Sequence, residues 1–342
     1  MPAVCRMRKG LHAALGLIIA LAVPQAIAQA SEAYARQLMD RGEYREAAAA
    51  LEDIEARTTP ADSGIYRMLI RAYLHLNLPD KALGACERGM RAQPSAGLEN
   101  TYVALLRNTR PRDQVEKTLI DALNANPQSP VFQKAVARML YEDNPQDERA
   151  GALLASAARL IPDDAEVHFF FGQWLCLNQR EPACIQELTT AIAKTDGDNP
   201  DALAQIWSML ATAHANMGQY EEAGAAWEQA RRANAALKQP SAWLDVQYAQ
   251  YLRQLGRLDE ADSSLRKVLH RYPDFGPAHF EAAQVALRRN DADTAAREAG
   301  RALSCSGVDH RERQNIHYFL SALYAHTGRY ADADRERTLA RE

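Results

Sequence analysis

The side chains that could do chemistry in this sequence are histidines, cysteines and clustered carboxylates. His310 and His317 are seven residues apart, and Asp332, Asp334 and Glu336 alternate near the C-terminus. The histidines form no three-ligand set and the acidic run lacks the rest of a calcium loop, so we interpret them as structural or solvated groups. G-x-S-x-G, H-E-x-x-H, G-x-G-x-x-G and P-loop motifs do not occur. The sequence therefore predicts no catalytic residues, no metal site and no cofactor.

The cysteines show no C-x-x-C metal spacing. Cys5 lies in the N-terminal segment, and Cys86 and Cys305 lie about six helix pairs apart, so we do not expect those two to pair. Cys176 ends one expected helix and Cys184 begins the next, so the two face each other across a hairpin. In an exported protein we predict a Cys176–Cys184 disulfide. The alternative is two small buried thiols.

The elements that position these groups are short helices, and the clearest pair lies within Asp201–Asn234. Apolar and small residues recur there at helical spacing, namely Trp207, Leu210, Ala211 and His214 before a turn and Ala223, Trp227 and Ala230 after it. Gly218 supplies the left-handed conformation that ends the first helix. Glu221 and Glu222 lie in the first turn of the second helix, where the helix dipole favours acidic side chains. The stretch therefore predicts a helical hairpin.

This hairpin resembles the tetratricopeptide repeat, because Trp207-x₂-Leu210 and Ala223-x₃-Trp227 match that family's pattern. One helix pair cannot bury its own apolar face, so the pattern predicts further copies. The residue that opens the second helix recurs nine times at intervals of 33 to 39 residues, at Ala47, Ala82, Val115, Ala150, Cys184, Ala223, Ala261, Ala295 and Ala333. The resemblance implies an all-α fold, a right-handed α-α superhelix (solenoid) of about nine tetratricopeptide repeats, over residues 29–342.

The first 28 residues have the three regions of a secretory signal peptide. Arg6, Arg8 and Lys9 form a basic start, and an apolar run is followed by the A-x-A site at Ala26–Ala28. We therefore expect cleavage after residue 28 and an exported protein, periplasmic or secreted, with no stable membrane insertion after cleavage. The alternative is an uncleaved membrane anchor, although the apolar run is short for a span.

The composition is 47% hydrophobic and 25% charged, which is ordinary for a soluble globular protein. Removal of residues 1–28 takes away three positive charges and no negative ones, and changes the net charge from −4 to −7. Proteins that bind nucleic acid carry a basic face, so we expect no nucleic-acid partner.

Tetratricopeptide arrays bind extended peptides or helices in a groove lined by the first helix of each repeat, and the resemblance implies the same here. The inner-face positions hold Arg67, Arg71, Asn100, Arg107, Phe132, Met139, Phe169, Gln173, Ser208, Thr212, Trp243, Gln250, Arg253, Phe280, Gln284 and Tyr318. The predicted groove is basic toward the N-terminus and aromatic toward the C-terminus. The family's carboxylate clamp of Lys and Asn is imitated only loosely, by Arg67, Arg71 and Asn100. The alternative is that some of the aromatic side chains pack between repeats.

The resemblance therefore implies a scaffold for protein or peptide partners in the cell envelope, and not an enzyme. A second interpretation is an accessory subunit or chaperone of an envelope enzyme, secretion or polysaccharide-export complex. A third is an enzyme with an unrecognised site, but the repeats leave no room for a catalytic domain. The longest joints, residues 195–200, 238–241 and 304–308, are candidate points of flexibility. Because the repeat frame continues across them, we expect one domain.

Overall fold

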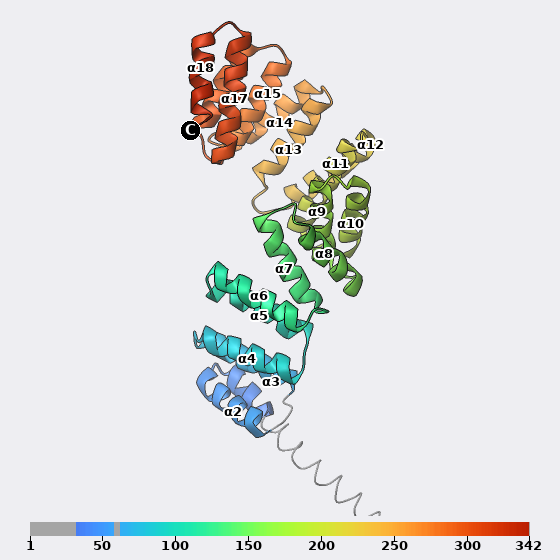
Figure 1. Ribbon diagram of the computed structural model, residues 1–342, viewed down its shortest axis with the longest axis vertical. Coiled ribbons are helices and arrows are strands. Elements are labelled where there is room, and N and C mark those ends of the chain that lie inside the picture. The colour runs from blue at the N-terminus through green and yellow to red at the C-terminus, as the bar shows by residue number, and fades with distance from the viewer. Residues whose placement is uncertain (1–31, 58–61, 342) are drawn as a thin grey trace, which may run out of the picture. The chain divides into compact units, whose positions relative to one another are not determined.

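The computed structural model describes residues 32–57 and 62–341, and every named element in these residues is a helix. The expected signal peptide, residues 1–28, lies outside the described residues. After a first helix at residues 32–40 come α2 (Tyr44–Arg57), α3 (Ser63–His75), α4 (Pro79–Ala92), α5 (Ala96–Thr109), α6 (Arg112–Ala125), α7 (Pro130–Asp143), α8 (Glu148–Leu160), α9 (Ala165–Leu177), α10 (Glu181–Lys194), α11 (Pro200–Asn216), α12 (Tyr220–Ala235), α13 (Ala242–Gln254), α14 (Leu258–Arg271), α15 (Gly276–Arg288), α16 (Ala292–Ser304), α17 (His310–His326) and α18 (Tyr330–Leu339). Successive helices pack as hairpins (Figure 1), so the predicted all-α fold of helix pairs is confirmed.

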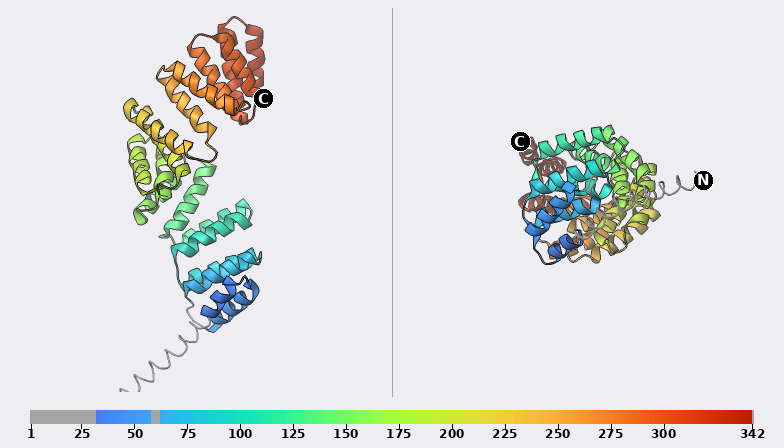
Figure 2. Two further views of the ribbon diagram at one scale, coloured as in Figure 1. Left: turned by 180° about the vertical axis from the view of Figure 1, so that it is seen from behind. Right: turned by 90° about the horizontal axis from the view of Figure 1, so that it is seen from below.

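The chain divides into two compact units, Met1–Ile161 and Pro162–Glu342. Unit 1 contains the described helices through α8, and unit 2 contains α9 to α18. Views from two further sides show the helix pairs within each unit (Figure 2). None of the joints singled out in the sequence lies at this boundary. In the described part of the chain, no helix is both long enough and apolar enough to cross a bilayer.

The residue that opens each second helix lies in the core. All nine of these residues are buried, from Ala47 to Ala333, and seven of them are alanines that are fully or almost fully covered. The N–H of Ala223 donates to the carbonyl O of Gln219 at 3.0 Å, which starts the regular hydrogen bonding of α12. A small side chain is needed here because the two helices of a hairpin approach closely. At Gly172 an added Cβ would lie 2.8 Å from Leu188 Cδ2, so α9 and α10 are tightly packed at that glycine.

The turns inside the hairpins use one backbone geometry in seven places. A left-handed residue ends the first helix at Gly42, Asn77, Gln179, Gly218, Gly256, Asn290 and Gly328. In the sixth hairpin the N–H of Gln219 donates back to the carbonyl O of His214 at 2.9 Å, which is the bond of a Schellman cap. The third and fourth hairpins have Pro111 and Pro145 in their turns, as the sequence predicted, and no described residue there has a positive φ.

Hydrogen bonds hold the loops of the second and third long joints, residues 238–241 and 304–308. The buried side chain of Asn234 accepts from the N–H of Ser241 at 2.7 Å and donates to its carbonyl O at 3.1 Å. In the last joint, Ser306 accepts the N–H of Gly276 at 2.8 Å and donates its own N–H to Asp274 at 3.1 Å. The sequence did not predict these bonds, because spacing within a helix says nothing about contacts made by the loops.

Candidate functional site

In unit 1 a basic cavity of about 390 Å³ lies on the first-helix face, between the helix at residues 32–40 and α3. Arg36, Arg67 and Arg71 line it together with methionine side chains and Asp40. Arg36 pairs with Glu32 of its own helix at 2.6 Å. Arg67 and Arg71 are exposed, and within the described residues neither makes an ion pair. The structure therefore brings two of the predicted groove residues together in a concave place where they face solvent.

The predicted residues on α5 divide into one solvated side chain and one that is bonded. Asn100 is exposed. Arg107 is also exposed, but its Nη2 donates to the carbonyl O of Ala135 on α7 at 3.4 Å. Next to it, Arg110 and Arg112 are held in ion pairs by carboxylates of α4 and α7. The second cavity of unit 1, about 290 Å³ and lined by these arginines, is therefore already neutralised in part by the protein itself.

Phe132 is wrong as a groove residue, because only 4% of it is exposed and it belongs to the core of unit 1. Met139 of the same helix is buried as well. Phe132 lies at the start of α7, where Ser129 Oγ accepts its N–H and donates to Glu99 Oε2 at 2.7 Å. Counted back from the residue that opens the second helix, Phe132 lies three positions away from the register of Arg67 and Phe169, which is close to one helical turn. Seven residues of α7 are buried, so a side chain on this helix is easily drawn into the core.

In unit 2 an open cavity of about 400 Å³ lies between α9 and α11, two neighbouring first helices. Phe169 and Phe170 line its α9 side as half-buried rings whose centroids are 5.5 Å apart. The buried Ile206 and the small Ala202 form its α11 side. The sequence predicted Phe169 as a groove residue, whereas Phe170 and Ile206 were not among the predicted positions. We call this place the α9–α11 cavity.

The rim of the α9–α11 cavity is acidic. Glu166, Asp196 and Asp201 lie on it, and Lys194 is its only lysine or arginine. Lys194 Nζ lies 2.5 Å from Asp163 Oδ1, and its hydrogen bond holds the pKa of the Asp163 carboxyl below its ordinary value. Lys194 is therefore paired with Asp163, a carboxylate that does not line the cavity.

The remaining predicted residues of α9 and α11 are polar. Gln173 is half-buried one turn after Phe169. Ser208 and Thr212 donate their hydroxyls to carbonyl oxygens of their own helix, at 2.9 and 3.0 Å. They therefore add a polar strip to the first-helix face without strong binding groups.

Gln250 and Arg253 of α13, both predicted groove residues, are half-buried and bond to a buried carboxylate. Arg253 Nε lies 2.5 Å from Oε1 of Glu281, a carboxylate that is only 1% exposed on α15. Burial raises the pKa of Glu281, and hydrogen bonds from Arg253 and Gln250 act against that rise. The two predicted residues thus compensate a buried charge on the neighbouring first helix.

The predicted aromatic residues toward the C-terminus differ in their exposure and packing. Trp243 is 42% exposed and meets Phe275 edge-on, with centroids 6.4 Å apart. Phe280 packs edge-on against Phe319 at 5.4 Å and contacts the hydrophobic cluster of α15, α16 and α17. Tyr318 is 50% exposed. Trp243 and Tyr318 are therefore available at the surface, while Phe280 packs between repeats, the alternative that the sequence left open.

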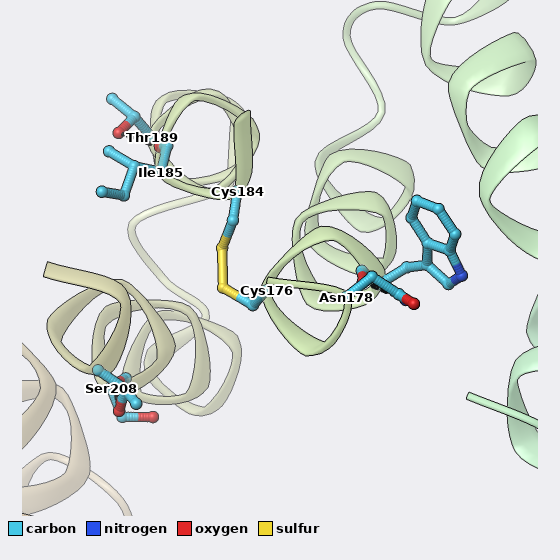
Figure 3. Close-up of a disulfide and its surroundings, with 8 residues drawn as sticks. Cys176, Asn178, Cys184, Ile185, Thr189 and Ser208 are labelled. Carbon is cyan, nitrogen blue, oxygen red and sulfur yellow. Dashed lines mark hydrogen bonds between the residues drawn. A yellow bond between two sulfur atoms is a disulfide. The ribbon is translucent and has the colours of Figure 1, made fainter. Parts of the chain in front are cut away.

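A disulfide joins Cys176 and Cys184 across the α9–α10 hairpin, with Cα atoms 5.2 Å apart (Figure 3). Figure 3 also shows Ser208, which lies on the neighbouring helix α11. Cys86 is a buried free thiol of unit 1, and Cys305 is a half-buried free thiol of unit 2. Burial raises the pKa of the Cys86 thiol to about 12, so this group is a poor nucleophile at neutral pH.

Two family models for the tetratricopeptide repeat match this chain. One matches residues 24–97 and 248–306, and the other matches residues 204–236. The chain contains tetratricopeptide repeats. The hairpins with proline turns lie outside the matched residues. A comparison with curated protein sequences finds no match.

Solved structures of tetratricopeptide type have the same fold. The Cut9–Hcn1 hetero-tetramer of the APC/C is similar with a TM-score of 0.53 and 14% identity, over 85% of this chain and 54% of that chain. The human IFIT1 dimer with m7Gppp-AAAA is similar with a TM-score of 0.54 and 15% identity, over 90% of this chain and 74% of that chain. This chain thus spans about half the length of the Cut9–Hcn1 chain, and at these identities the similarity shows the fold alone.

Proposed function

We propose that this protein is an exported tetratricopeptide scaffold that binds protein or peptide partners through its first-helix faces in the cell envelope. Its mechanism is binding and not turnover. The basic start, apolar run and A-x-A site at the N-terminus support export. The Cys176–Cys184 disulfide supports it independently, because disulfides persist in oxidising compartments and are rare in the cytosol.

The observation that carries the binding proposal is the α9–α11 cavity. It opens between two first helices, and the half-buried rings of Phe169 and Phe170 line it. Large aromatic side chains are enriched among interface hot spots, because covering them releases water from a large apolar area. The exposed Trp243 is a further aromatic side chain in the same unit.

We propose a protein partner rather than nucleic acid, because the processed chain would carry a net charge of −7. A surface with this net charge repels polyanions except at local basic sites. The clearest basic site is the cavity that Arg67 and Arg71 line. A peptide partner can instead combine apolar anchors with charges of either sign.

The experiment is affinity capture from an envelope extract with the wild-type protein and two variants. Phe169→Ala is expected to lose the partner, with a loss of roughly 2 kcal/mol in binding if Phe169 is a hot spot. Tyr330→Ala, on the exposed start of α18, is the control and should retain it. The melting temperature of each variant is measured as well. A Phe169→Ala variant that melts early yet captures the partner as well as wild type would identify Phe169 as a core residue and contradict the proposal.

Export has its own test. N-terminal sequencing of the protein from the envelope fraction should find a chain that begins near Gln29. Recovery of residues 1–28, intact, on protein from the cytoplasm would contradict export and leave the binding proposal to be judged separately.

A further inference from the structure

A cavity of about 830 Å³ lies in unit 2 between α14 and α16, the second helices of the seventh and eighth repeats. Its floor is α15, which contributes Ala282, Val285 and Ala286, and its sides include Leu265 of α14 and Thr294 of α16. None of the groove residues predicted from the sequence lines it. This place, which we call the α14–α16 cavity, is therefore separate from the first-helix surface assigned above to partner binding.

The α14–α16 cavity lies where two large side chains are missing. Ala282 and Ala286 stand thirteen and nine residues before Ala295, the residue that opens the second helix of the eighth repeat. In the other eight repeats at least one of these two positions holds leucine, phenylalanine or tyrosine. The pairs are Tyr34 and Leu38, Leu69 and Tyr73, Tyr102 and Leu106, Ala137 and Tyr141, Phe171 and Leu175, Leu210 and His214, Tyr248 and Leu252, and Leu320 and Tyr324. Because packed helices relax only partly around a smaller residue, two alanines leave a hollow.

In other repeats the larger side chains at these positions reach the second helix of the preceding repeat. Tyr102 of α5 donates its hydroxyl to Oε1 of Glu87 on α4 at 3.3 Å, and Tyr73 of α3 donates to a glutamate of α2. The ring of Tyr248 on α13 lies 5.9 Å from the ring of Trp227 on α12. An alanine cannot span that distance, so the space that a ring occupies in those repeats stays open between α15 and α14.

The three arginines that line the cavity are already paired within the protein. Arg266 pairs with a carboxylate of its own helix. Arg289 Nη2 lies 2.6 Å from Asp259 Oδ1, and Arg301 Nη1 lies 3.0 Å from Glu298 Oε1. Because each guanidinium has a carboxylate partner, none of them is free to select an anionic ligand. The apolar floor and the space above it therefore decide what the cavity accepts.

The dimensions of the cavity favour a side chain that belongs to a longer chain. A cavity of about 150 Å³ already holds a benzene ring, so the α14–α16 cavity has room for a ring and for backbone on both sides of it. Its lining extends along α15 from His279 to Arg289, which is about 15 Å at the helical rise. A peptide segment can use that length, whereas a single small aromatic molecule would leave most of it empty.

We propose that the α14–α16 cavity binds one aromatic side chain of a protein partner, which fills the space that Ala282 and Ala286 leave open, with the partner's chain lying between α14 and α16. The partner thus supplies to the eighth repeat what the other repeats supply from their own sequence. The inference goes beyond the proposed function, which places partner binding on the first-helix faces. Covering an aromatic ring and an apolar floor together removes a large apolar area from water.

The test uses a displayed library of random peptides of about nine residues and the purified protein as the cell processes it. Peptides are first depleted on Ala282→Leu combined with Ala286→Tyr, which gives the eighth repeat the pair that the second and ninth repeats carry. They are then selected on wild type, and the enriched peptides should share one Tyr, Phe or Trp. In isothermal titration of an enriched peptide, replacing that residue by Ala should weaken binding at least about tenfold.

Matched variants locate the binding. The filled double variant should bind the same peptide at least about tenfold more weakly than wild type does. Ala235→Leu, at the exposed end of α12, is the control and should leave the affinity unchanged. The melting temperature of each variant is measured, and if the double variant melts earlier than wild type, Ala282→Leu alone is used for the same comparison.

Three results would overturn the inference. They are no enrichment after depletion, enriched peptides that share no aromatic residue, and equal affinity for wild type and the filled variant. Binding of N-acetyltyrosinamide as tightly as the peptide would assign the cavity to small aromatic molecules and overturn a protein segment as its occupant. None of these results bears on capture of the envelope partner through Phe169, so the proposed function is judged separately.

Discussion

Nδ1 of His168 on α9 lies 2.6 Å from Oε2 of Glu187 on α10, and this contact between the two helices of a hairpin occurs three times in unit 2. The equivalent pairs are His279–Glu298 and His317–Glu336, each at 2.7 Å and each 19 residues apart in the sequence. Nε2 of His168 also lies 3.1 Å from the carbonyl O of Pro162. Each of these contacts therefore links the first helix of a repeat to the second. This agrees with the interpretation of His317 as a structural residue.

Replacement of Glu187 by Ala should destabilise unit 2, because Nδ1 of the buried His168 would lose its partner. A buried polar group left unsatisfied costs about 1–3 kcal/mol. The free energy of unfolding measured by urea denaturation should fall by that amount. Gln186→Ala, at the neighbouring exposed position of α10, should change it by no more than about 0.5 kcal/mol. Equal losses in the two variants would show that the contact contributes nothing specific.

Gln179 is expected to be a strained residue in the turn between α9 and α10. It has φ 57°, whereas the equivalent turn of the sixth repeat has Gly218 with φ 73°. The left-handed conformation costs a residue with a Cβ about 1–2 kcal/mol. Glycine avoids this cost, but the greater conformational entropy that it loses on folding offsets about 0.5–1 kcal/mol of the gain. Gln179→Gly should therefore stabilise the protein by about 0.5–1 kcal/mol in urea denaturation.

The reverse change supplies the control for that prediction. An added Cβ at Gly218 would have no atom within 4 Å, so Gly218→Ala changes only the backbone preference. It should destabilise the protein by about the amount that Gln179→Gly gains. If both variants shift stability in the same direction, the left-handed conformation does not govern these turns.

Loss of the Cys176–Cys184 disulfide should lower stability by about 2.5 kcal/mol, the loop-closure term for a short loop. The double change of both cysteines to Ala measures this cleanly, because Ala stands at the place of Cys184 in seven other repeats. The double variant should melt at the same temperature with and without reductant, while wild type should melt earlier when reduced.

Mass mapping without reduction tests the pairing itself. It should find one linked peptide that joins Cys176 to Cys184, and alkylation after unfolding should label Cys86 and Cys305. Free thiols at both Cys176 and Cys184 in the exported protein would contradict the disulfide, and a Cys86–Cys305 link would contradict the free state of those two groups.

The stability of unit 2 should depend on pH through Glu281. Burial raises the pKa of Glu281 above its ordinary value of 4.5, so the folded protein holds this proton more tightly than the unfolded chain does. The stability that this group contributes is therefore complete below about pH 4.5 and is lost as pH rises through the folded pKa. Glu281→Gln should remove that slope, because Gln does not titrate.

Urea denaturation of wild type and Glu281→Gln at several pH values measures the effect. The difference in unfolding free energy between the two should change in the variant's favour as pH rises from about 4 to about 7. Glu228→Gln, an exposed carboxylate on α12, is the control and should run parallel to wild type. A constant difference between Glu281→Gln and wild type over this range would show that the carboxyl does not titrate with a raised pKa.

The sequence by itself determined the hairpins. Ala223 is recognisable as the closest point of two helices, and Gly218 as the end of the first, because both follow from spacings and backbone preferences within about one repeat. The same local reasoning placed Cys176 and Cys184 opposite each other. It also placed Arg67, Arg71 and Phe169 on accessible first-helix faces.

Only the tertiary structure decided how much of each first helix its neighbours cover. Phe132 occupies an inner-face position by sequence, yet the structure buries it in the core of unit 1. Arg253 meets Glu281 across 28 residues, and the α9–α11 cavity joins Phe169 to Ile206. These outcomes depend on the rotation and separation of helices about one repeat apart. Periodicity defines the apolar face of a helix, but it does not fix the rotation of the helix to better than one or two residues. A rotation of that size can move a side chain from the groove into the core.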